Sequence, residues 1–169
     1  MESKDLAQKK LFLMNELQNL YNSKQFKEAE SKAKELIKKF PKSASIYNFL
    51  GLIFKQQKEI EKAVKSFEKA IRIDPTFPDS YNNLGNLYTK VNKFKESIQN
   101  FNKAIKINQK LFMVHYNLGL SYKALGDFNN AKKCFLKSLN IRSDFFYAYR
   151  QLGMIKKWKK EDKTLIELK

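Results

Sequence analysis

The chain has 169 residues, the length of a single domain, and its 43% hydrophobic and 14% aromatic content excludes an intrinsically disordered protein. No run of about 18 apolar residues occurs, so the sequence predicts no transmembrane segment. The first residues, MESKDLAQKKLFLMNEL, carry charges on both sides of a short apolar patch and have no small-residue cleavage site, which is not typical of a signal peptide. The single Cys134 cannot form an internal disulfide, so we expect a cytoplasmic location.

The net charge of +17 has two interpretations. A basic surface is typical of proteins that bind nucleic acid or anionic membranes. However, only three of the basic residues are Arg, and the Lys residues are scattered along every predicted helix. Phosphate recognition favours Arg forks, and a nucleic-acid site would gather its charge on one face. We therefore do not expect nucleic-acid binding, and we expect an acidic protein partner instead.

Similar residues recur every 34 positions along the chain. A charged lead-in precedes a divergent first repeat, and three regular repeats follow. In each regular repeat, apolar residues at three- and four-residue steps predict two helices joined by a short polar turn. A partial fifth repeat supplies one more helix before a short amphipathic end. The ranges are 1–9 for the lead-in, 10–43, 44–77, 78–111 and 112–145 for the repeats, 146–157 for the partial repeat and 158–169 for the end.

The recurring residues have physical reasons. Small residues are expected where the two helices of a repeat cross most closely, and aromatic residues fill the gaps between helices. A proline ends the second helix because it lacks an N–H. One slot holds Phe67, Phe101 and Phe135, and another holds Tyr47, Tyr81, His115 and Tyr149. The predicted structural positions are Gly51, Gly85, Gly119, Gly153, Ala63, Ala131, Pro41 and Pro75.

This order of aromatic, Leu-Gly, aromatic, small, aromatic, small and Pro resembles the tetratricopeptide repeat (TPR) family, over residues 10 to about 157. The resemblance implies an all-α fold, a right-handed α-α superhelix (TPR solenoid) of antiparallel helix pairs. We expect about nine helices in a single TPR domain, residues 1–169. The first repeat departs from the pattern, with Glu16-Leu17 where later repeats have Leu-Gly. Because a terminal repeat has no outer neighbour, we expect Glu16 to face water.

The last segment, residues 158–169, has two interpretations. It is either a polar cap for the stacked repeats, or the beginning of a continuation in a larger protein. We favour the capping segment.

No pattern of catalytic or metal-binding residues stands out, so we expect no enzyme activity, no cofactor and no metal. His115 is the one histidine and falls in an aromatic slot, which indicates a packing role. Cys134 has no base placed beside it, as a nucleophile would need. No second His and no Cys pair stands at the spacing of metal ligands.

The resemblance implies that ligands lie along a concave wall lined by the first helix of each repeat. Amide side chains gather on the residues that helix geometry points inward, and an amide can pair with the backbone of an extended peptide whatever its sequence. Apolar and basic side chains share this face. The predicted peptide-binding residues are Asn48, Phe49, Asn82, Asn83, Asn86, Lys90, Tyr116, Asn117, Lys123, Tyr147, Arg150 and Gln151.

Two binding patterns of the family can be compared with this face. Some TPR domains hold the C-terminal carboxylate of heat-shock chaperones with two Asn and three basic residues. Of that pattern only Asn86 and Asn117 match, while Asn82, Tyr147 and Gln151 stand in place of the basic residues, so we do not expect this clamp. Asn83 and Asn117 resemble instead the asparagine ladder of the TPR segment of O-linked glycosyltransferases.

The leading functional interpretation is a protein–protein interaction scaffold that binds an extended, acidic peptide segment in its concave groove. Packed helices lie about 9–10 Å apart, and an extended chain advances about 3.3 Å per residue, so each repeat should contact about three ligand residues. The alternative is the N-terminal substrate- or partner-recruiting TPR arm of a larger sulfotransferase- or glycosyltransferase-like enzyme.

Overall fold

The protein folds into α-helices throughout the part of the chain that the computed structural model describes, which is residues 2–167 for the backbone and 7–156 for the side chains. No strand occurs in residues 2–167. The helices are α1 (Glu2–Asn22), α2 (Phe26–Lys39), α3 (Ala44–Gln56), α4 (Ile60–Ile73), α5 (Pro78–Lys90), α6 (Phe94–Ile107), α7 (Phe112–Ala124), α8 (Phe128–Ile141) and α9 (Phe146–Glu167).

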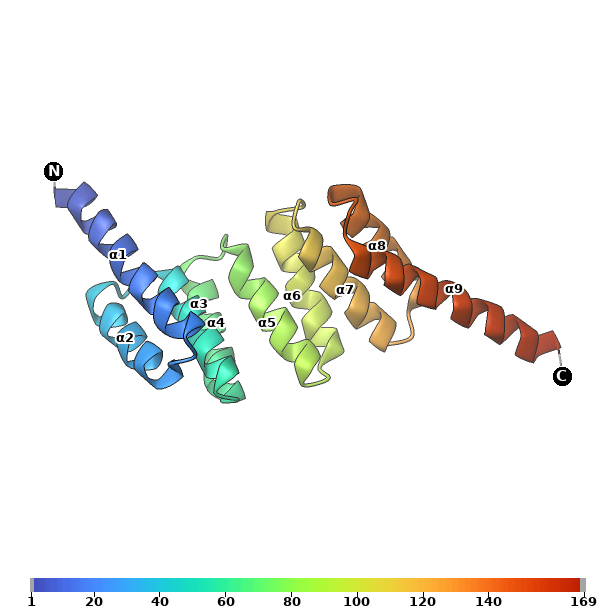
Figure 1. Cartoon of the computed structure of the whole chain (residues 1–169), viewed down its shortest axis with the longest axis horizontal. Helices are drawn as coiled ribbons and strands as arrows, with labels where there is room; N and C mark the ends of the chain where they lie inside the picture. The colour runs from blue at the N-terminus through green and yellow to red at the C-terminus, as the bar shows by residue number, and fades with distance from the viewer. Residues whose placement is uncertain (1, 168–169) are drawn as a thin grey trace. The chain divides into compact units, whose positions relative to one another are not determined.

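The chain divides into two compact units, Met1–Leu87 and Tyr88–Lys169, and the boundary falls inside α5. Each unit contains an antiparallel helix pair with a short turn, α3 with α4 in the first unit and α7 with α8 in the second (Figure 1). Helices α4, α6 and α8 begin at Ile60, Phe94 and Phe128, the residues around which the repeat pattern of the sequence predicts a second helix.

The two pairs are held by the same close contact between a glycine and a phenylalanine ring. A Cβ atom added at Gly51 would lie 2.6 Å from Cε1 of Phe67, and one added at Gly119 would lie 2.6 Å from Cε1 of Phe135. Both rings are fully buried. Because real Cβ atoms do not approach a ring so closely, only glycine leaves room for the ring against the first helix.

Small residues on either side of the ring complete the contact. Ala63 and Ala70 flank Phe67 one turn away in each direction, and both are fully buried. Ala131 and Ser138 do the same beside Phe135. The second helix of each pair therefore presents a stripe of small, Phe and small residues, which is the buried face of an amphipathic helix.

In the first helix pair, α1 with α2, the large and the small side chain at the helix crossing change places. Leu17 stands where later repeats have the glycine, Ala33 stands where they have the phenylalanine, and both side chains are fully buried. The Glu16 side chain is 40% exposed, but its Oε2 atom is buried and lies 2.6 Å from the Lys32 ammonium on α2. The divergent start of the chain therefore still forms a close helix pair.

A left-handed residue closes the turn between the two helices of each pair. These residues are Lys24, Lys58, Asn92 and Gly126, with φ of 60°, 64°, 61° and 76°, and they too are 34 positions apart. The next residue in each turn donates its N–H across five residues, as in a Schellman motif. These bonds run from Gln25 to Leu20, Glu59 to Phe54, Lys93 to Tyr88 and Asp127 to Tyr122, at 2.8–2.9 Å.

The ends of the chain add long helices. The predicted lead-in belongs to α1, which begins at Glu2. Helix α9 continues without a break to Glu167, and the side chains of the predicted capping segment lie outside the described residues, so its capping role stays a prediction. Helices α3, α5, α7 and α9 begin at residues 44, 78, 112 and 146. The division of the chain into one domain with these repeats remains our interpretation.

Gly153 differs from the other repeat glycines. A Cβ atom added there would meet no atom of the described residues within 4 Å outside its own helix backbone. The helix-crossing role predicted for Gly153 therefore has no counterpart in the described structure.

We expect Gly119→Ala to lower the free energy of unfolding by about 1–3 kcal/mol, because the new methyl group overpacks against Phe135. The matched control is Gly153→Ala, because Gly153 holds the same repeat position and the described structure leaves open space for its new methyl group. It should be neutral or raise stability by up to about 1 kcal/mol through helix propensity. Urea denaturation followed by circular dichroism measures both, and equal effects of the two substitutions would contradict the packing explanation.

We also expect Lys58→Gly to raise the free energy of unfolding by about 0.5–1 kcal/mol, because glycine adopts a positive φ without a Cβ clash. Lys65→Gly is the control, since Lys65 is an exposed residue in the interior of α4. That substitution should cost about 1 kcal/mol. A destabilised Lys58→Gly variant in thermal or urea unfolding would show that the turn does not require this conformation.

Candidate functional site

In the first unit, the predicted amide residues lie on α3 and α5 and bond to one another. Asn83 donates Nδ2–H to Oδ1 of Asn48 at 3.0 Å, and Asn86 donates to Oδ1 of Asn82 at 3.4 Å. Asn48 is buried, whereas the three asparagines of α5 are partly exposed. The contact between α3 and α5 thus uses part of the hydrogen-bonding capacity that the sequence predicts for binding a ligand. The amide side chains that remain partly exposed lie on α5.

Phe49 serves packing in this unit. Its ring meets Tyr21 of α1 edge to face at 5.3 Å, and Gln56 donates to the Tyr21 hydroxyl oxygen at 2.8 Å. Only 8% of Phe49 is exposed. Phe49 therefore exposes little surface for the peptide contact that the sequence predicts.

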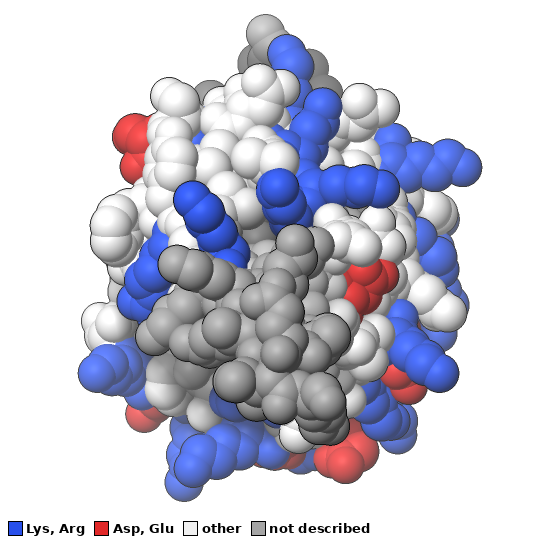
Figure 2. Space-filling model, turned by 90° about the vertical axis from the view of Figure 1, so that its right-hand side faces the viewer, with Lys and Arg blue, Asp and Glu red and all other residues white. Residues whose placement is uncertain are grey.

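In the second unit, the predicted basic and amide residues of α7 and α9 meet. Lys123 donates from Nζ to Oε1 of Gln151 at 2.6 Å. Gln151 is buried, Lys123 is partly exposed, and Arg150, which directly precedes Gln151 on α9, is exposed. Lys90, near the C-terminal end of α5, is exposed as well. In the view of Figure 2, Lys and Arg side chains greatly outnumber Asp and Glu on the described surface.

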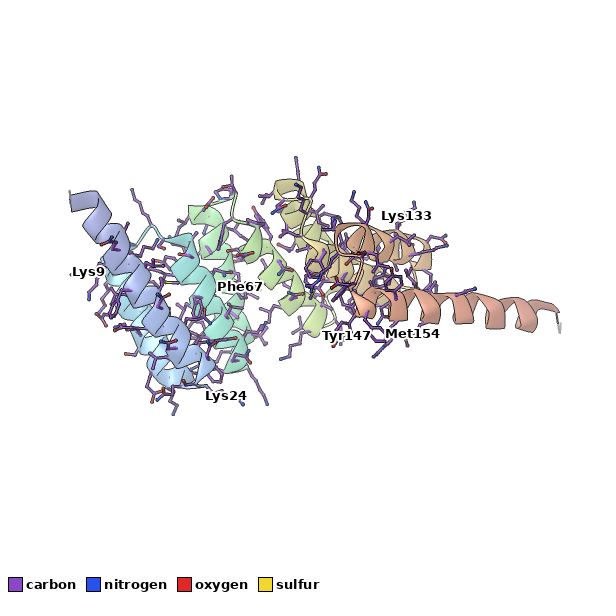
Figure 3. The ribbon with its side chains drawn as sticks, turned by 45° about the horizontal axis from the view of Figure 1, so that its top comes forward. Lys9, Lys24, Phe67, Lys133, Tyr147 and Met154 are labelled. Atoms are coloured by element: carbon purple, nitrogen blue, oxygen red, sulfur yellow. The ribbon has the colours of Figure 1, made fainter. Side chains whose placement is uncertain are left out.

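The predicted aromatic residues of this unit join a larger ring cluster. Tyr116 lies edge to face with Phe145 at 5.1 Å, and Tyr147 lies 5.6 Å from Phe145. Phe112 also lies edge to face with Phe145, at 5.1 Å between ring centres. Tyr147 remains 57% exposed, with Met154 also exposed further along α9 (Figure 3). Tyr116 therefore supports the helix contact, and Tyr147 presents a ring to solvent.

Sequence reasoning missed a hydroxyl cluster in the second unit. The hydroxyl oxygens of Thr89 and Ser97 lie 2.6 Å apart, those of Ser97 and Ser121 lie 2.8 Å apart, and Thr89 lies 3.2 Å from Ser121. Ser97 and Ser121 are fully buried. The signal was Ser97 in a slot that holds Ala63 and Ala131 in the other repeats. Because buried hydroxyls need partners, the three residues support one another and link α5, α6 and α7.

The surroundings of Cys134 and His115 suppress the chemical reactivity that these two side chains could have. Burial, together with the negative charge of Asp127, raises the pKa of the Cys134 thiol to about 11. The thiolate, which is the nucleophilic form, is therefore scarce near neutral pH. In the described part of the chain, no group of three His, Cys, Asp or Glu side chains is placed to hold a metal ion.

His115 is buried in its aromatic slot. Its Nε2–H donates to the carbonyl oxygen of Gln109 at 3.0 Å. Desolvation lowers the pKa of the imidazole below its ordinary value, the nearby Lys137 ammonium acts in the same direction, and the bond to Gln109 opposes them. The ring is therefore held neutral near pH 7.

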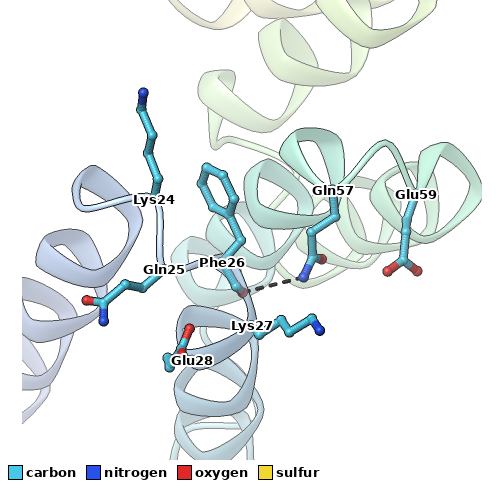
Figure 4. A pocket seen from close by; sticks show the side chains of 7 residues that line it. All are labelled: Lys24, Gln25, Phe26, Lys27, Glu28, Gln57 and Glu59. Atoms are coloured by element: carbon cyan, nitrogen blue, oxygen red, sulfur yellow. Dashed lines mark hydrogen bonds between the residues drawn. The ribbon is translucent and has the colours of Figure 1, made fainter.

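A surface hollow in the first unit lies beside the turns that follow α1 and α3 (Figure 4). Phe26 and Gln57 lie between the acidic residues Glu28 and Glu59 at its edge. Gln57 donates to Oε2 of Glu30 at 3.1 Å. The Lys34 ammonium, 2.6 Å from Glu30, and this bond hold the pKa of Glu30 below its usual value. None of the predicted binding residues lines this hollow.

Comparisons with known proteins connect the chain to repeat proteins. The family model described as TPR repeat matches residues 51–92 and 85–126, and the one described as Tetratricopeptide repeat matches residues 114–145. No curated protein sequence matches the chain. No helix in the described residues is long and apolar enough to cross a membrane.

Several solved structures share the fold. A crystal structure of MamA matches with a TM-score of 0.77 and 23% identity, over 83% of this chain and 82% of that one. PilF of Pseudomonas aeruginosa matches with a TM-score of 0.84 and 19% identity, over 90% and 69%. The first TPR domain of Spaghetti (RPAP3), bound to the HSP90 peptide SRMEEVD, matches with a TM-score of 0.66 and 23% identity, over 68% and 91%. These likenesses establish the predicted all-α fold of TPR-type helix pairs.

We expect His115→Tyr to remove a part of the pH dependence of stability. Because the imidazole pKa is lower in the folded protein than in the unfolded chain, His115 contributes no penalty above pH 6.5 and an increasing one as the pH falls below it. Tyr fits the slot, since Tyr81 is buried at the equivalent position. Urea denaturation at pH 7.5 and pH 5 should show a smaller loss for the variant, and an equal loss would mean that His115 is not desolvated.

Proposed function

Because the chain belongs to the tetratricopeptide-repeat family, we propose that it is a protein-interaction scaffold that binds an extended, acidic peptide segment. The ligand lies along the first helices of the repeats, α3, α5, α7 and α9. Asparagines of α5 pair with its backbone, and basic side chains of α5, α7 and α9 attract its carboxylates. Since the amides ignore most ligand side chains, the affinity is modest, about micromolar.

The observation that carries this proposal is the pairing of amide and basic groups on the same helices. Asn82, Asn83 and Asn86 remain partly exposed on α5, and exposed Lys90 follows Asn86 by one turn. An amide has two donors and an acceptor, so the single bonds of Asn82 and Asn83 leave capacity for a ligand. On α9, Arg150 adds a second exposed cation.

The charge of the ligand follows from the charge of the face. The predicted inward positions hold Lys and Arg residues and a single acid, Asp79. Like charges are repelled from such a surface and unlike charges are steered towards it. The TPR domain of Spaghetti provides a parallel, because the HSP90 peptide bound to it, SRMEEVD, has three acidic residues and one basic residue.

The test is association of a fluorescein-labelled, twelve-residue peptide of alternating Glu and Ser with a Lys90→Gln/Lys123→Gln double variant. Gln at position 123 keeps a donor for Gln151, so the contact with α9 survives. Removing both charges should slow association several-fold at low salt and flatten its salt dependence, because long-range steering is screened by ions. Stopped-flow anisotropy at 50 and 200 mM salt measures the rates.

The matched control is Lys65→Gln/Lys132→Gln, which removes the same net charge from exposed positions on α4 and α8. This control should change the association rate less than the first-helix variant does. Equal effects of the two double variants would show that overall charge, and not the α5–α7–α9 face, attracts the peptide. A peptide of alternating Lys and Ser should not bind either form.

A further inference from the structure

Helix α9 carries the repeat residues of a first helix but exposes the side that the other first helices bury. Tyr149 occupies the slot of Tyr81 and His115, yet Tyr149 is 54% exposed whereas those residues are 8% and 7% exposed. Gly153, one turn further along, is open to solvent. Ala148 and Ile155, on the opposite side of α9, are buried against the second unit. One side of α9 is therefore packed and the other is not.

The unpacked side has a defined composition. With about 100° of rotation per residue, five exposed residues of α9 fall on one side of the helix, and we call this side the open face. It consists of Phe146, Tyr149, Arg150, Gly153 and Lys156. Phe146 is the most exposed large apolar residue of the described chain, at 67%.

The other repeats show what covers this surface. At Gly51 and Gly119 the partner is a helix that lays a phenylalanine ring on the glycine, between two small residues. In the first unit, the Lys69 ammonium of that helix lies 6.0 Å from the ring centre of Tyr47, which holds the slot of Tyr149. The covering helix thus places Phe67 on Gly51 and Lys69 over Tyr47, and these contacts involve residues two apart on α4 and four apart on α3.

We propose that the open face of α9 binds an amphipathic helix of another protein, which lies against Gly153 as α4 lies against Gly51. This helix presents a phenylalanine between small residues, in the pattern small-x3-Phe-x-Lys-small that α4 shows at Ala63, Phe67, Lys69 and Ala70. The ring rests on Gly153, the lysine lies over Tyr149, and Phe146 covers the end of the helix.

The positive charge of the open face favours a helix of a different protein over a second copy of this chain. Arg150 and Lys156 flank Gly153 on the open face, and the face includes no acidic residue. Each copy of the chain carries a net charge of +17, so two copies repel each other at this surface. The occupant is therefore a helix with acidic residues around its apolar stripe.

The probe is a capped synthetic peptide with the α4 sequence from Glu59 to Asp74, in which Lys62→Glu and Lys65→Glu make the flanks acidic. A peptide with the additional change Phe67→Ala is its control. Isolated helices of this length are marginal in water, so titration extends to about 2 mM. Selective ¹⁵N-glycine labelling of the full chain reports the site, because the sequence has five glycines and Gly153→Ala assigns the relevant amide signal.

The expected result is a saturable shift of the Gly153 amide signal, with little change at Gly51 or Gly119 and no shift with the Phe67→Ala peptide. Gly153→Leu should weaken anisotropy-measured peptide binding at least about tenfold, because a Cβ at the equivalent Gly51 would collide with the ring. The Gly153→Leu variant should stay folded, since no atom of the described neighbouring residues lies within 4 Å of a Cβ built at Gly153. Lys133→Leu, which adds the same side chain at an exposed site on α8, should bind as the wild type does.

Three outcomes would overturn the proposal. They are no shift of Gly153 up to the highest peptide concentration, equal binding of the two peptides, and unchanged binding by Gly153→Leu. Sedimentation velocity provides a further check. A dimer of the wild type that Gly153→Leu converts to a monomer would make the open face an interface between copies, and the partner-helix proposal would be wrong.

Discussion

The close approach of a phenylalanine ring to a glycine is the contact on which the α3–α4 and α7–α8 helix pairs depend. The ring of Phe67 or Phe135 occupies the space that a side chain would take on the first helix, so the two backbones come together without a cavity. Interiors are packed as densely as organic crystals, and a volume change of one methylene is felt there. The flanking small residues, such as Ala63 and Ala70, are needed for the same reason.

The contact between a small residue and a ring is altered in the first helix pair and again at α9. At the start, Leu17 and Ala33 exchange the large and the small side chain between the helices, so that the crossing of a helix pair with no glycine is still filled by two fully buried side chains. Complementary volume at the crossing is therefore conserved between the repeats, while the identity of each residue is not. At the other end, Gly153 keeps the small residue, and no ring of the described residues lies within 4 Å of a Cβ built there. That asymmetry distinguishes α9 from α3 and α7, and it leaves the open face of α9 uncovered by the described residues.

The hydrogen bonding of the buried polar residues also depends on their packed neighbours. Asn48, Gln151 and Ser97 are buried, and each has a hydrogen-bond partner within the chain. A buried polar group without a partner costs free energy, and so side chains that look available in a helical projection are drawn into pairs. The ligand-binding capacity then belongs to partly exposed amides, such as Asn82, and to exposed cations such as Lys90. The scaffold and the binding face share residues, and mutations at the buried amides would affect both.

The sequence by itself determined the helix pairs, their starts at residues such as Ile60 and Phe94, and the slots of Gly51 and Phe67, because these follow from local periodicity and from a repeat that any packed copy must satisfy. It did not reveal the left-handed turn at Lys58, since lysine carries no sign of a positive φ. Nor did it separate Asn48 from Asn82, or Tyr81 from Tyr149. Their exposure depends on which neighbouring helix covers them, and only the tertiary structure decides that, because burial is a property of the packed neighbours and not of the residue.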